Sequence, residues 1–225
     1  MSIANKVLVI APHPDDEVLG VGGTIAKHVK NEDFVLVCFV CNRAYSHRYS
    51  EESIREDKEN ALNAKRILSY HQHIFLDLKD ERLDERLINV IVPIEKVIFK
   101  FKPDIVYIPH KGDNNQDHRA VFKASMVALR TFSASFVKEV FAYEVLSSTE
   151  QSASFVDSIF MPNYYVDIKE FIEVKKLAFE SYQREKREFP HPRSIKGIEI
   201  LAMKRGMEAN LEYAEAFEVV RMIKK

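Results

Sequence analysis

The segment that decides the fold is NKVLVIAPHPDDEV, residues 5–18. Its first half, Lys6–Ala11, is an apolar run rich in β-branched residues, which is typical of a buried strand. Pro12 and Pro14 end that strand, because proline donates no hydrogen bond to a sheet and restricts the residue before it. A helical pattern follows over about residues 20–30. This order indicates an open α/β sheet, in which ligands bind beyond the carboxyl ends of the strands.

The turn after this strand carries four polar side chains, His13, Asp15, Asp16 and Glu17. His13 and Asp16 stand three residues apart on a tight turn, so both can reach one metal ion. Imidazole and carboxylate together suit zinc or a similar transition metal better than calcium. Asp15 could then face a metal-bound water. The alternative is that the acids only cap the following helix, but capping needs one acid and neither two prolines nor a histidine.

The composition is that of an ordinary globular protein. The 225 residues are 46% hydrophobic and 30% charged, which is enough for one sizeable α/β domain. A formal net charge of −1 argues against a nucleic-acid binder that works by broad electrostatics. No stretch approaches the ~20 apolar residues of a membrane span, and the first strand begins too early for a signal peptide. We therefore expect a cytoplasmic protein.

Two cysteines, Cys38 and Cys41, fall in the apolar run 34–41, which is a second expected strand. Side chains three apart on a strand point to opposite faces, so this pair is poorly placed to chelate or to form a disulfide. A redox pair is usually placed at a helix N-terminus, where the thiol pKa falls. We expect core cysteines, although Cys41 could face the site at the end of the strand.

The polar loop over residues 42–50 contains Tyr45 and lies at the same sheet edge, so it could line the pocket. Glu51–Leu68 has partial helical spacing. Arg55 near its start is expected to reach an anionic or polyol substrate, and a solvated helix arginine is an equally good interpretation. Further strands are expected over 73–78, 105–109, 139–146 and 160–168, and further helices over 83–100, 121–130, 170–188 and 195–205. The chain then continues to a final apolar run over 217–223.

A second polar cluster follows the strand expected over 105–109 and runs from His110 to Arg119. It repeats the arrangement of a buried strand, a polar turn and a helix. Parallel strands place both turns at one edge of the sheet, so His118 could complete a site with the two ligands of the first turn. Two histidines and one carboxylate with an open position form a catalytic zinc arrangement, and Asp117 could orient a ligand. A plain helix start is the alternative.

The two clusters together resemble the PIG-L (LmbE-like) family of zinc-dependent N-acetylglucosamine deacetylases. The first is the family's Pro-His-Pro-Asp-Asp-Glu turn, complete at residues 12–17, and the second is its Asp-His-Arg element at residues 117–119. Arg193, Gly206 and the segment 213–217 also resemble a subset of the family. The resemblance therefore covers nearly the whole chain.

The resemblance implies a single Rossmann-like three-layer α/β domain over residues 1–225, with a mostly parallel sheet and helices on both faces. Residues 1–146 would form its core, and residues 147–225 would add strands and helices that complete the pocket. The expected partner is a small-molecule N-acetylated sugar conjugate. A homo-oligomer is plausible because some family members assemble, and neither nucleic acid nor a membrane span is expected.

Carried over by position, the resemblance makes His13, Asp16 and His118 the metal ligands and Asp15 the general base. Zn²⁺ is the expected cofactor, with another divalent transition metal such as Fe²⁺ as the alternative. Many members have a histidine three positions before the last ligand, where this chain has Asn115. Asn115 could instead donate to the oxyanion of a tetrahedral intermediate.

The missing histidine leaves the general acid open. His110 or His191 could substitute for it, or the general base Asp15 could serve as both base and acid. Substrate hydroxyls or phosphate would be recognised by Arg55, Arg193 and the loop tyrosine Tyr45.

The expected reaction is removal of an N-acetyl group by attack of metal-activated water. A zinc-dependent amidohydrolase acting on a non-sugar N-acyl substrate is one alternative. A signalling domain of the receiver type also carries an acidic pair after its first strand, but it binds magnesium through oxygen ligands and has no use for His13. A catalytically silent carbohydrate-binding domain is the last alternative, and the retained ligands and base argue against it.

Overall fold

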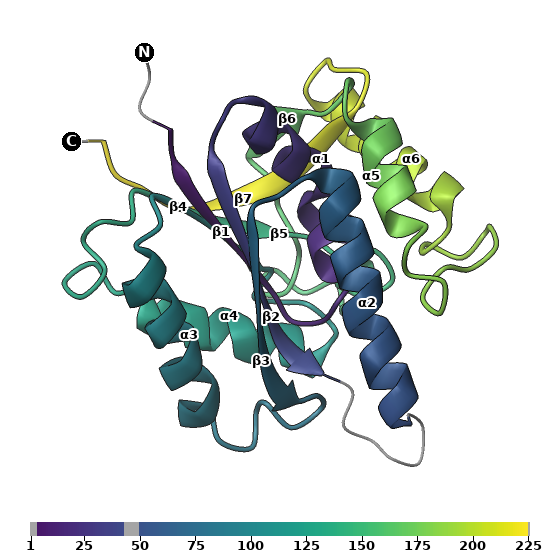
Figure 1. Cartoon of the computed structure of the whole chain (residues 1–225). Helices are drawn as coiled ribbons and strands as arrows, with labels where there is room; N and C mark the ends of the chain where they lie inside the picture. The colour runs from purple at the N-terminus through teal and green to yellow at the C-terminus, as the bar shows by residue number, and fades with distance from the viewer. Residues whose placement is uncertain (1–3, 43–49, 225) are drawn as a thin grey trace.

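Seven strands form one sheet in the computed structural model, which describes residues 4–42 and 50–224 (Figure 1). The strands are β1 (Lys6–Ala11), β2 (Phe34–Asn42), β3 (Gln72–Lys79), β4 (Ile105–Pro109), β5 (Glu139–Tyr143), β6 (Tyr164–Asp167) and β7 (Ala214–Met222). Their order across the sheet is β3-β2-β1-β4-β5-β7-β6. The strands β1 to β5 are parallel, and β7 runs antiparallel to both of its neighbours.

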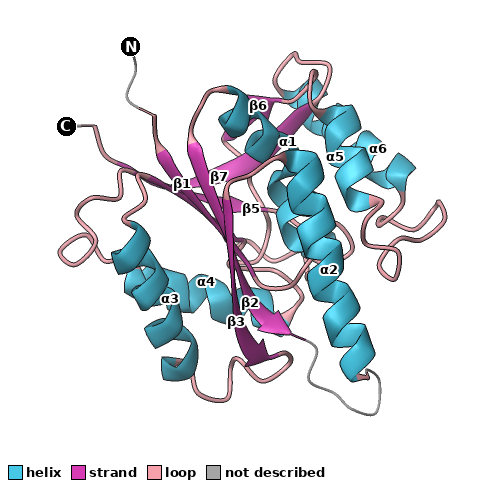
Figure 2. Cartoon of the chain, in the orientation of Figure 1, coloured by secondary structure: helices cyan, strands magenta, loops and turns pink. Residues whose placement is uncertain are grey.

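Helices cover both faces of this sheet (Figure 2). They are α1 (Asp16–Lys30), α2 (Glu51–Leu68), α3 (Ile88–Phe101), α4 (Gln116–Ala128), α5 (Ile172–Phe179) and α6 (Ile195–Glu208), with a short 3₁₀ helix at Thr149–Gln151. Alternate residues of a strand point to opposite faces. Leu8 and Ile10 accordingly pack with α3 and α4, and Val7 and Val9 with α1, α2 and α5. The predicted three-layer α/β fold with a mostly parallel sheet is confirmed.

The position of the strand β1 in the sheet determines where the site lies. It pairs with β2 on one side and β4 on the other, which is where the strand order across the sheet reverses. Ligands of open α/β sheets bind at such a reversal, outside the carboxyl ends of the strands. The turns after β1 and β4 therefore lie next to each other, although about 100 residues separate them in the sequence.

The helix predicted over residues 170–188 is wrong beyond Phe179, where α5 ends. The chain continues in turns, in which the N–H of Arg187 donates to the carbonyl of Arg193 (2.9 Å). Tyr182 is buried there, with its hydroxyl bonded to the turn that follows β1. Charged residues at helical spacing have the same pattern in a helix and in a looped backbone, so the buried contacts of this segment decide its shape.

The helices α1 and α4 begin earlier than predicted, at Asp16 and Gln116, so both polar turns run directly into helices. The helix predicted from residue 83 begins later, at Ile88, after a series of turns. The consequence for the site is that two of the proposed metal ligands stand in first turns of helices rather than in loops.

The two cysteines are buried and free, so the prediction of core cysteines is confirmed. The expectation that Cys38 and Cys41 point to opposite faces is wrong. The pairing of β2 with β3 shifts register between Phe39 and Cys41, and both thiols belong to the hydrophobic cluster under α3 and α4. Burial raises the pKa of Cys38 to about 12 and that of Cys41 to about 11, which makes both thiols poor nucleophiles.

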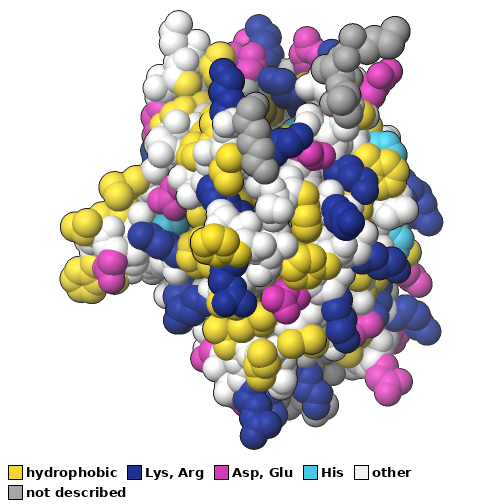
Figure 3. All heavy atoms as spheres, turned by 90° about the vertical axis from the view of Figure 1, so that its left-hand side faces the viewer, with side chains coloured by type: hydrophobic (Ala, Val, Ile, Leu, Met, Phe, Trp, Pro, Cys, Tyr) yellow, Lys and Arg dark blue, Asp and Glu magenta, His cyan; other side chains and the backbone are white. Residues whose placement is uncertain are grey.

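The side of the molecule that carries α3 shows many Lys and Arg side chains, with hydrophobic side chains in separate groups between them (Figure 3). Scattered hydrophobic side chains of this kind are normal on a solvated surface. Within the two described ranges, no helix is both long and apolar enough to cross a lipid bilayer.

Candidate active site

The turn after β1 depends on an unusual backbone conformation at Asp15. Its φ is 119°, a value that residues other than glycine rarely adopt. The carbonyl of Asp15 accepts hydrogen bonds from the N–H groups of Val18 (3.0 Å) and Leu19 (2.9 Å), which starts α1. Its own N–H donates to Oε2 of Glu17 (3.0 Å). Backbone strain of this kind concentrates at functional sites.

Glu17 ties this turn to the C-terminal part of the chain. Its side chain is fully buried, and its Oε1 accepts a hydrogen bond from the hydroxyl of Tyr182. Burial raises the pKa of Glu17 to about 7, although the bonds from Tyr182 and from the Asp15 N–H oppose this. Glu17 therefore stabilises the backbone conformation of Asp15 through this hydrogen bond. It does not line the cavity described below.

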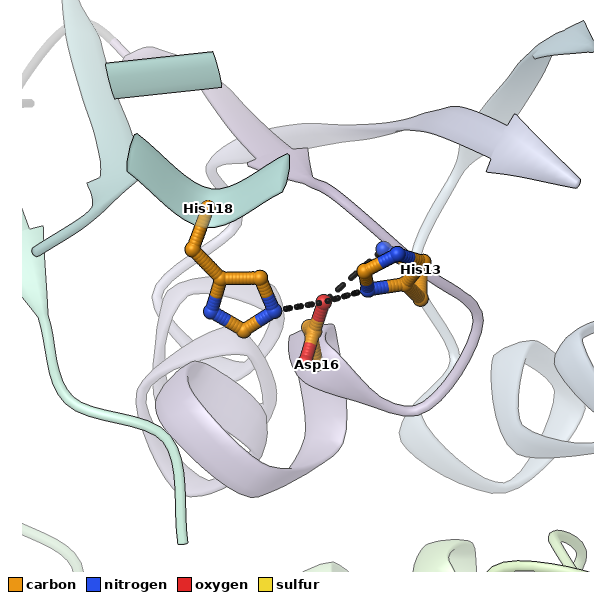
Figure 4. A group of neighbouring side chains, drawn as sticks. All are labelled: His13, Asp16 and His118. Atoms are coloured by element: carbon orange, nitrogen blue, oxygen red, sulfur yellow. Dashed lines mark hydrogen bonds and ion pairs between the residues drawn. The ribbon is translucent and has the colours of Figure 1, made fainter. Parts of the chain in front are cut away.

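Three side chains of the two turns converge on one point, His13, Asp16 and His118 (Figure 4). Oδ2 of Asp16 lies 3.3 Å from Nδ1 of His13 and 3.2 Å from Nε2 of His118. The two imidazole rings are 5.4 Å apart, centre to centre. Asp16 and His118 are 1% exposed, and His13 is the member of the group that reaches the solvent-facing side.

These donor atoms fit a zinc ion. Two imidazole nitrogens and a carboxylate oxygen are ligands of catalytic zinc sites. Tetrahedral zinc with bonds of about 2.0–2.3 Å has ligand atoms roughly 3.3–3.8 Å apart, close to the distances from Asp16 to the two imidazoles. Burial would raise the pKa of Asp16, but His118 and His13 outweigh this and lower it. The carboxylate is therefore ionised and ready to bind a cation.

The turn after β4 orients His118 through Asp113. Nδ1 of His118 lies 3.3 Å from Oδ2 of Asp113, and Asp113 is in turn held by the hydroxyls of Ser148 and Thr149. Burial alone would lower the pKa of His118, but Asp16 and Asp113 outweigh it and raise that pKa to about 9. Metal-binding histidines are commonly oriented by a carboxylate on their second nitrogen, and Asp113 stands in that place.

Asp117 orients the other imidazole. Its Oδ2 lies 3.0 Å from Nε2 of His13 and accepts the N–H of Glu81 (2.7 Å). Asn115 is the N-cap of α4, where its Oδ1 accepts the N–H of Asp117 (2.8 Å). Each histidine of the group therefore faces Asp16 with one nitrogen and a separate carboxylate with the other.

The carboxylate of Asp15 lies beside the guanidinium of Arg193. Its Oδ2 lies 3.3 Å from Nη1 of Arg193, and the same nitrogen contacts Glu185. Nε of Arg193 donates to Oγ of Ser147 (2.5 Å). Burial raises the pKa of Asp15 well above its ordinary value, and the guanidinium of Arg193 opposes that rise. An ionisable acid with a raised pKa beside a metal-binding group is a candidate proton acceptor.

A cavity of about 140 Å³ opens beside these residues. His13, Asp15, Asn115 and Asp117 line it from the two turns, and Arg193 lines it from the C-terminal part. Among the described residues, its lining includes six carboxylate side chains, Asp15, Asp57, Asp80, Glu81, Asp117 and Glu185. Carboxylates accept hydrogen bonds from hydroxyl groups and attract cations, so the cavity suits a polyol ligand and a metal ion.

The structure separates several predicted residues from this cavity. The predicted catalytic residue His110 is fully buried between Oε2 of Glu218 (2.9 Å) and the carbonyl of Ser158 (2.9 Å), and it does not line the cavity. His191 is exposed and accepts the N–H of Arg193 (3.0 Å). Neither imidazole is among the residues that line the cavity beside Asp15.

Of the predicted substrate-binding residues that the structure describes, one lines the cavity and one does not. Arg55 is exposed on α2 and lies outside the cavity lining, whereas Ile54 and Lys58 on the same helix line it. Arg193 does line the cavity, but its guanidinium is bound to carboxylates of the protein. Tyr45 lies outside the described residues.

Sequence reasoning missed Asp113 and Glu185. Asp113 belongs to the polar cluster after β4, and its spacing of five residues from His118 gave no sign of a contact across the first turn of α4. Glu185 lies in the segment mispredicted as helix, so its contact with Arg193 could not be anticipated. The only available signal was the concentration of acids around each histidine.

Two C-terminal features that resemble the family, Gly206 and the segment 213–217, have structural roles. Glu215 on β7 accepts the N–H groups of Gly23 (2.8 Å) and Thr24 (2.7 Å) in α1, and it pairs with buried Lys175 (2.6 Å). A Cβ on Gly206 would stand 2.6 Å from the carbonyl oxygen of Leu211, so no larger residue fits there. The contacts of Glu215 hold α1, and with it the first turn, against β7.

The fold and these side chains define an α/β protein in which two histidines and a carboxylate are placed to hold a metal ion at the carboxyl edge of the sheet. Residues 8–129, more than half of the chain, match the family model of PIG-L, described as GlcNAc-PI de-N-acetylase. The chain belongs to this deacetylase family.

Individual relatives agree with this membership. The chain is 33% identical over 186 residues to the uncharacterized deacetylase YaiS of Escherichia coli (strain K12), covering 79% of this chain and 91% of the relative. It is 27% identical over 195 residues to diacetylchitobiose deacetylase of Thermococcus kodakarensis, covering 79% and 69%. The fold is similar to N,N'-diacetylchitobiose deacetylase from Pyrococcus horikoshii, with a TM-score of 0.78 and 22% identity over 97% of this chain and 84% of that chain.

Proposed function

We propose that this protein is a metal-dependent hydrolase that removes the N-acetyl group of an N-acetylglucosamine-type sugar conjugate. The observation that carries the proposal is the convergence of His13, Asp16 and His118 beside buried Asp15, at the edge of a polar cavity. Family membership supports the reaction class, and two relatives named as sugar deacetylases support the substrate class.

His13, Asp16 and His118 would hold the ion, with zinc as the first choice and Fe²⁺ as the alternative. A zinc ion in such a site supplies a Lewis acid that brings the pKa of water from 15.7 to about 7. The three donors are preorganised for it, because Asp113 and Asp117 each face the second nitrogen of one histidine.

Asp15 would act as the general base that takes the proton of the attacking water. Its raised pKa brings it towards the working pH, where a general base is most effective. Arg193 holds the carboxylate in position and favours its ionised form. Because His110 and His191 stand outside the cavity, Asp15 is also the group that would return the proton to the departing amine.

Asn115 would contribute to stabilising the oxyanion. Its Oδ1 is fixed by the N–H of Asp117, so the amide NH₂ has a defined direction, and Asn115 lines the cavity. A preorganised donor of this kind stabilises the charge that develops in the transition state. The substrate hydroxyls would bind to the carboxylates of the wall, with residues 147–225 completing the pocket through Glu185 and Arg193.

The test is a substrate panel. Acetate release is measured for N-acetylglucosamine, diacetylchitobiose, N-acetylglucosamine conjugates with lipid or nucleotide aglycones, and N-acetyl amino acids, with and without a chelator. We expect release from at least one sugar, loss with chelator and recovery on adding Zn²⁺ or Fe²⁺. Release from N-acetyl amino acids alone would favour the non-sugar amidohydrolase. Turnover that is insensitive to thorough metal removal would contradict the proposal.

Location and assembly remain sequence predictions. We propose a cytoplasmic protein that acts on a small molecule. The near-zero net charge supports the proposal that it binds no nucleic acid. The family resemblance allows a homo-oligomer, and sedimentation at several concentrations would measure the state of assembly.

A further inference from the structure

A second set of metal-binding atoms lies on the other side of His13. Ligand atoms of His13, Cys41 and Asp117 all stand within 4.8 Å of one another. Cys41 comes from the end of β2, where its N–H donates to the carbonyl of Pro12 (2.9 Å) and so joins β2 to the turn after β1. All three residues line the cavity, so an ion in solution can reach them.

Asp117 supplies an independent sign of a ligand at this place. Its side chain is fully buried, and Oδ1 has no hydrogen-bond partner among the described residues. An ionised carboxylate oxygen without a partner is costly to bury. A cation bound between Asp117 and the Cys41 sulfur would satisfy that oxygen.

The two sides of the His13 ring face different groups. Nδ1 lies 3.3 Å from Asp16, and Nε2 lies 3.0 Å from Asp117. A neutral imidazole has one nitrogen lone pair free to accept or to bind a metal. His13 can therefore serve the group with Asp16 and His118, or the group with Cys41 and Asp117, but as a neutral ligand it cannot serve both.

We propose that His13, Cys41 and Asp117 form a second site for a thiophilic divalent ion, and that occupation of this site inhibits the enzyme by withdrawing His13 from Asp16 and His118. A sulfur ligand selects Zn²⁺ or Cd²⁺ over Mg²⁺ and Mn²⁺. On binding, the Cys41 thiol loses its proton to solvent and the sulfur donates an electron pair to the ion. No oxidation or reduction takes place.

The direct test is a titration of the metal-free protein with Cd²⁺, followed by ultraviolet absorption of the thiolate-to-cadmium charge-transfer band. The group of His13, Asp16 and His118 contains no sulfur, so the band reports on the second site alone. We expect the band in the wild-type protein and its loss in Cys41→Ser. Cys38→Ala is the matched control, because Cys38 lies on the same strand but in the core, away from the cavity, and it should keep the band.

The absence of a band in the wild-type protein, or its persistence in Cys41→Ser, would overturn the proposal. The readout does not need turnover, so it stands apart from a failure of the proposed deacetylase function. Asp117→Asn provides a second variant, which should weaken Cd²⁺ binding while the thiol remains present.

Inhibition is measured as acetate release at increasing Zn²⁺ and expressed relative to the maximum of each variant. We expect excess Zn²⁺ to inhibit the wild-type and Cys38→Ala proteins. In Cys41→Ser the half-inhibitory concentration should rise by roughly tenfold or more, since even residues that only orient a ligand are worth about 10–100-fold in metal affinity. Equal half-inhibitory concentrations in the three proteins would overturn the inhibitory role.

Discussion

The turns after β1 and β4 have the same plan, a buried strand followed by polar residues and a helix. They differ in how the backbone positions the side chains of the site. The first turn places Asp15 and Asp16 side by side through a positive φ at Asp15. The second has an ordinary N-cap at Asn115 and presents His118 from inside α4. The first turn thus uses backbone strain to aim two acids, whereas the second uses helix geometry to aim one imidazole.

The two turns therefore differ in how sensitive they are to substitution. A ligand in a regular helix keeps its direction from the helix, and its carboxylate partner only refines it. A side chain on a strained turn depends on every bond that holds the turn, here those from Glu17 and Arg193. Substitutions in the first turn are therefore expected to disturb the site more widely than substitutions in the second.

The largest effect is expected from removing one imidazole of each turn. In His13→Ala and His118→Ala, metal content should fall well below that of the wild type and acetate release should drop to the level of the metal-free protein, because two ligands hold zinc poorly. Elemental analysis and turnover measure this. His191→Ala is the control, since this exposed histidine lies off the cavity. Full metal occupancy in both ligand variants would remove them as ligands.

Asp15→Ala should lower kcat on the order of 100-fold or more while metal content stays normal, as expected for a general base. Asparagine has the same size and tolerates a positive φ. Asp15→Asn therefore removes the base without changing the backbone of the turn. The two variants should be similarly slow. Near-normal turnover with metal retained would show that another group takes the proton.

Asp113→Asn should weaken metal affinity by roughly 10–100-fold, because His118 loses the carboxylate that orients its Nδ1. A competition assay with a chromogenic chelator measures the affinity. Asp104→Asn is a matched control, because this carboxylate binds the N–H of Lys6 near the other end of β4. If both variants bound metal as the wild type does, α4 alone would orient His118.

His110→Gln should leave kcat unchanged and cost about 1–3 kcal/mol of folding free energy, the usual penalty for a broken buried hydrogen bond. Burial lowers the pKa of His110, but Glu218 and Ser158 outweigh it and raise that pKa above 6.5. The ion pair therefore stabilises the fold fully below pH 6.5 and is lost as the pH rises through the raised pKa.

Urea unfolding at a series of pH values tests this smallest effect. Over that rise in pH, the free energy of unfolding should fall more steeply in the wild type than in His110→Gln. Parallel curves would show that His110 is neutral in the fold, and a drop in kcat would return it to the active site.

Much of the fold could be predicted because its signals are local. The bounds of β1, β4 and α2 agree with the predicted ranges, since proline turns and helical spacing mark them. The position of β7 between β5 and β6 could not be predicted, because antiparallel pairing over such sequence distances leaves no local pattern.

The same division holds for the site. His13, Asp16 and His118 could be placed together, because residues after the carboxyl ends of neighbouring parallel strands must meet. The burial of His110 away from the cavity could not be predicted, because a position directly after a strand does not determine the direction of the side chain. Cys41 lines the cavity, as its place at the end of the strand allowed, but the shift of register in β2 that puts it on the same face as Cys38 could not be predicted.

The place of β7 has a consequence for how the protein is made. β6 lies at the edge of the sheet and pairs with β7, and β7 also pairs with β5. During translation β6 therefore waits for a neighbour until residues 214–222 have left the ribosome. Until then β5 and β6 each have an edge that lacks its partner β7, and unpaired strand edges of this kind make a partly folded chain prone to aggregation.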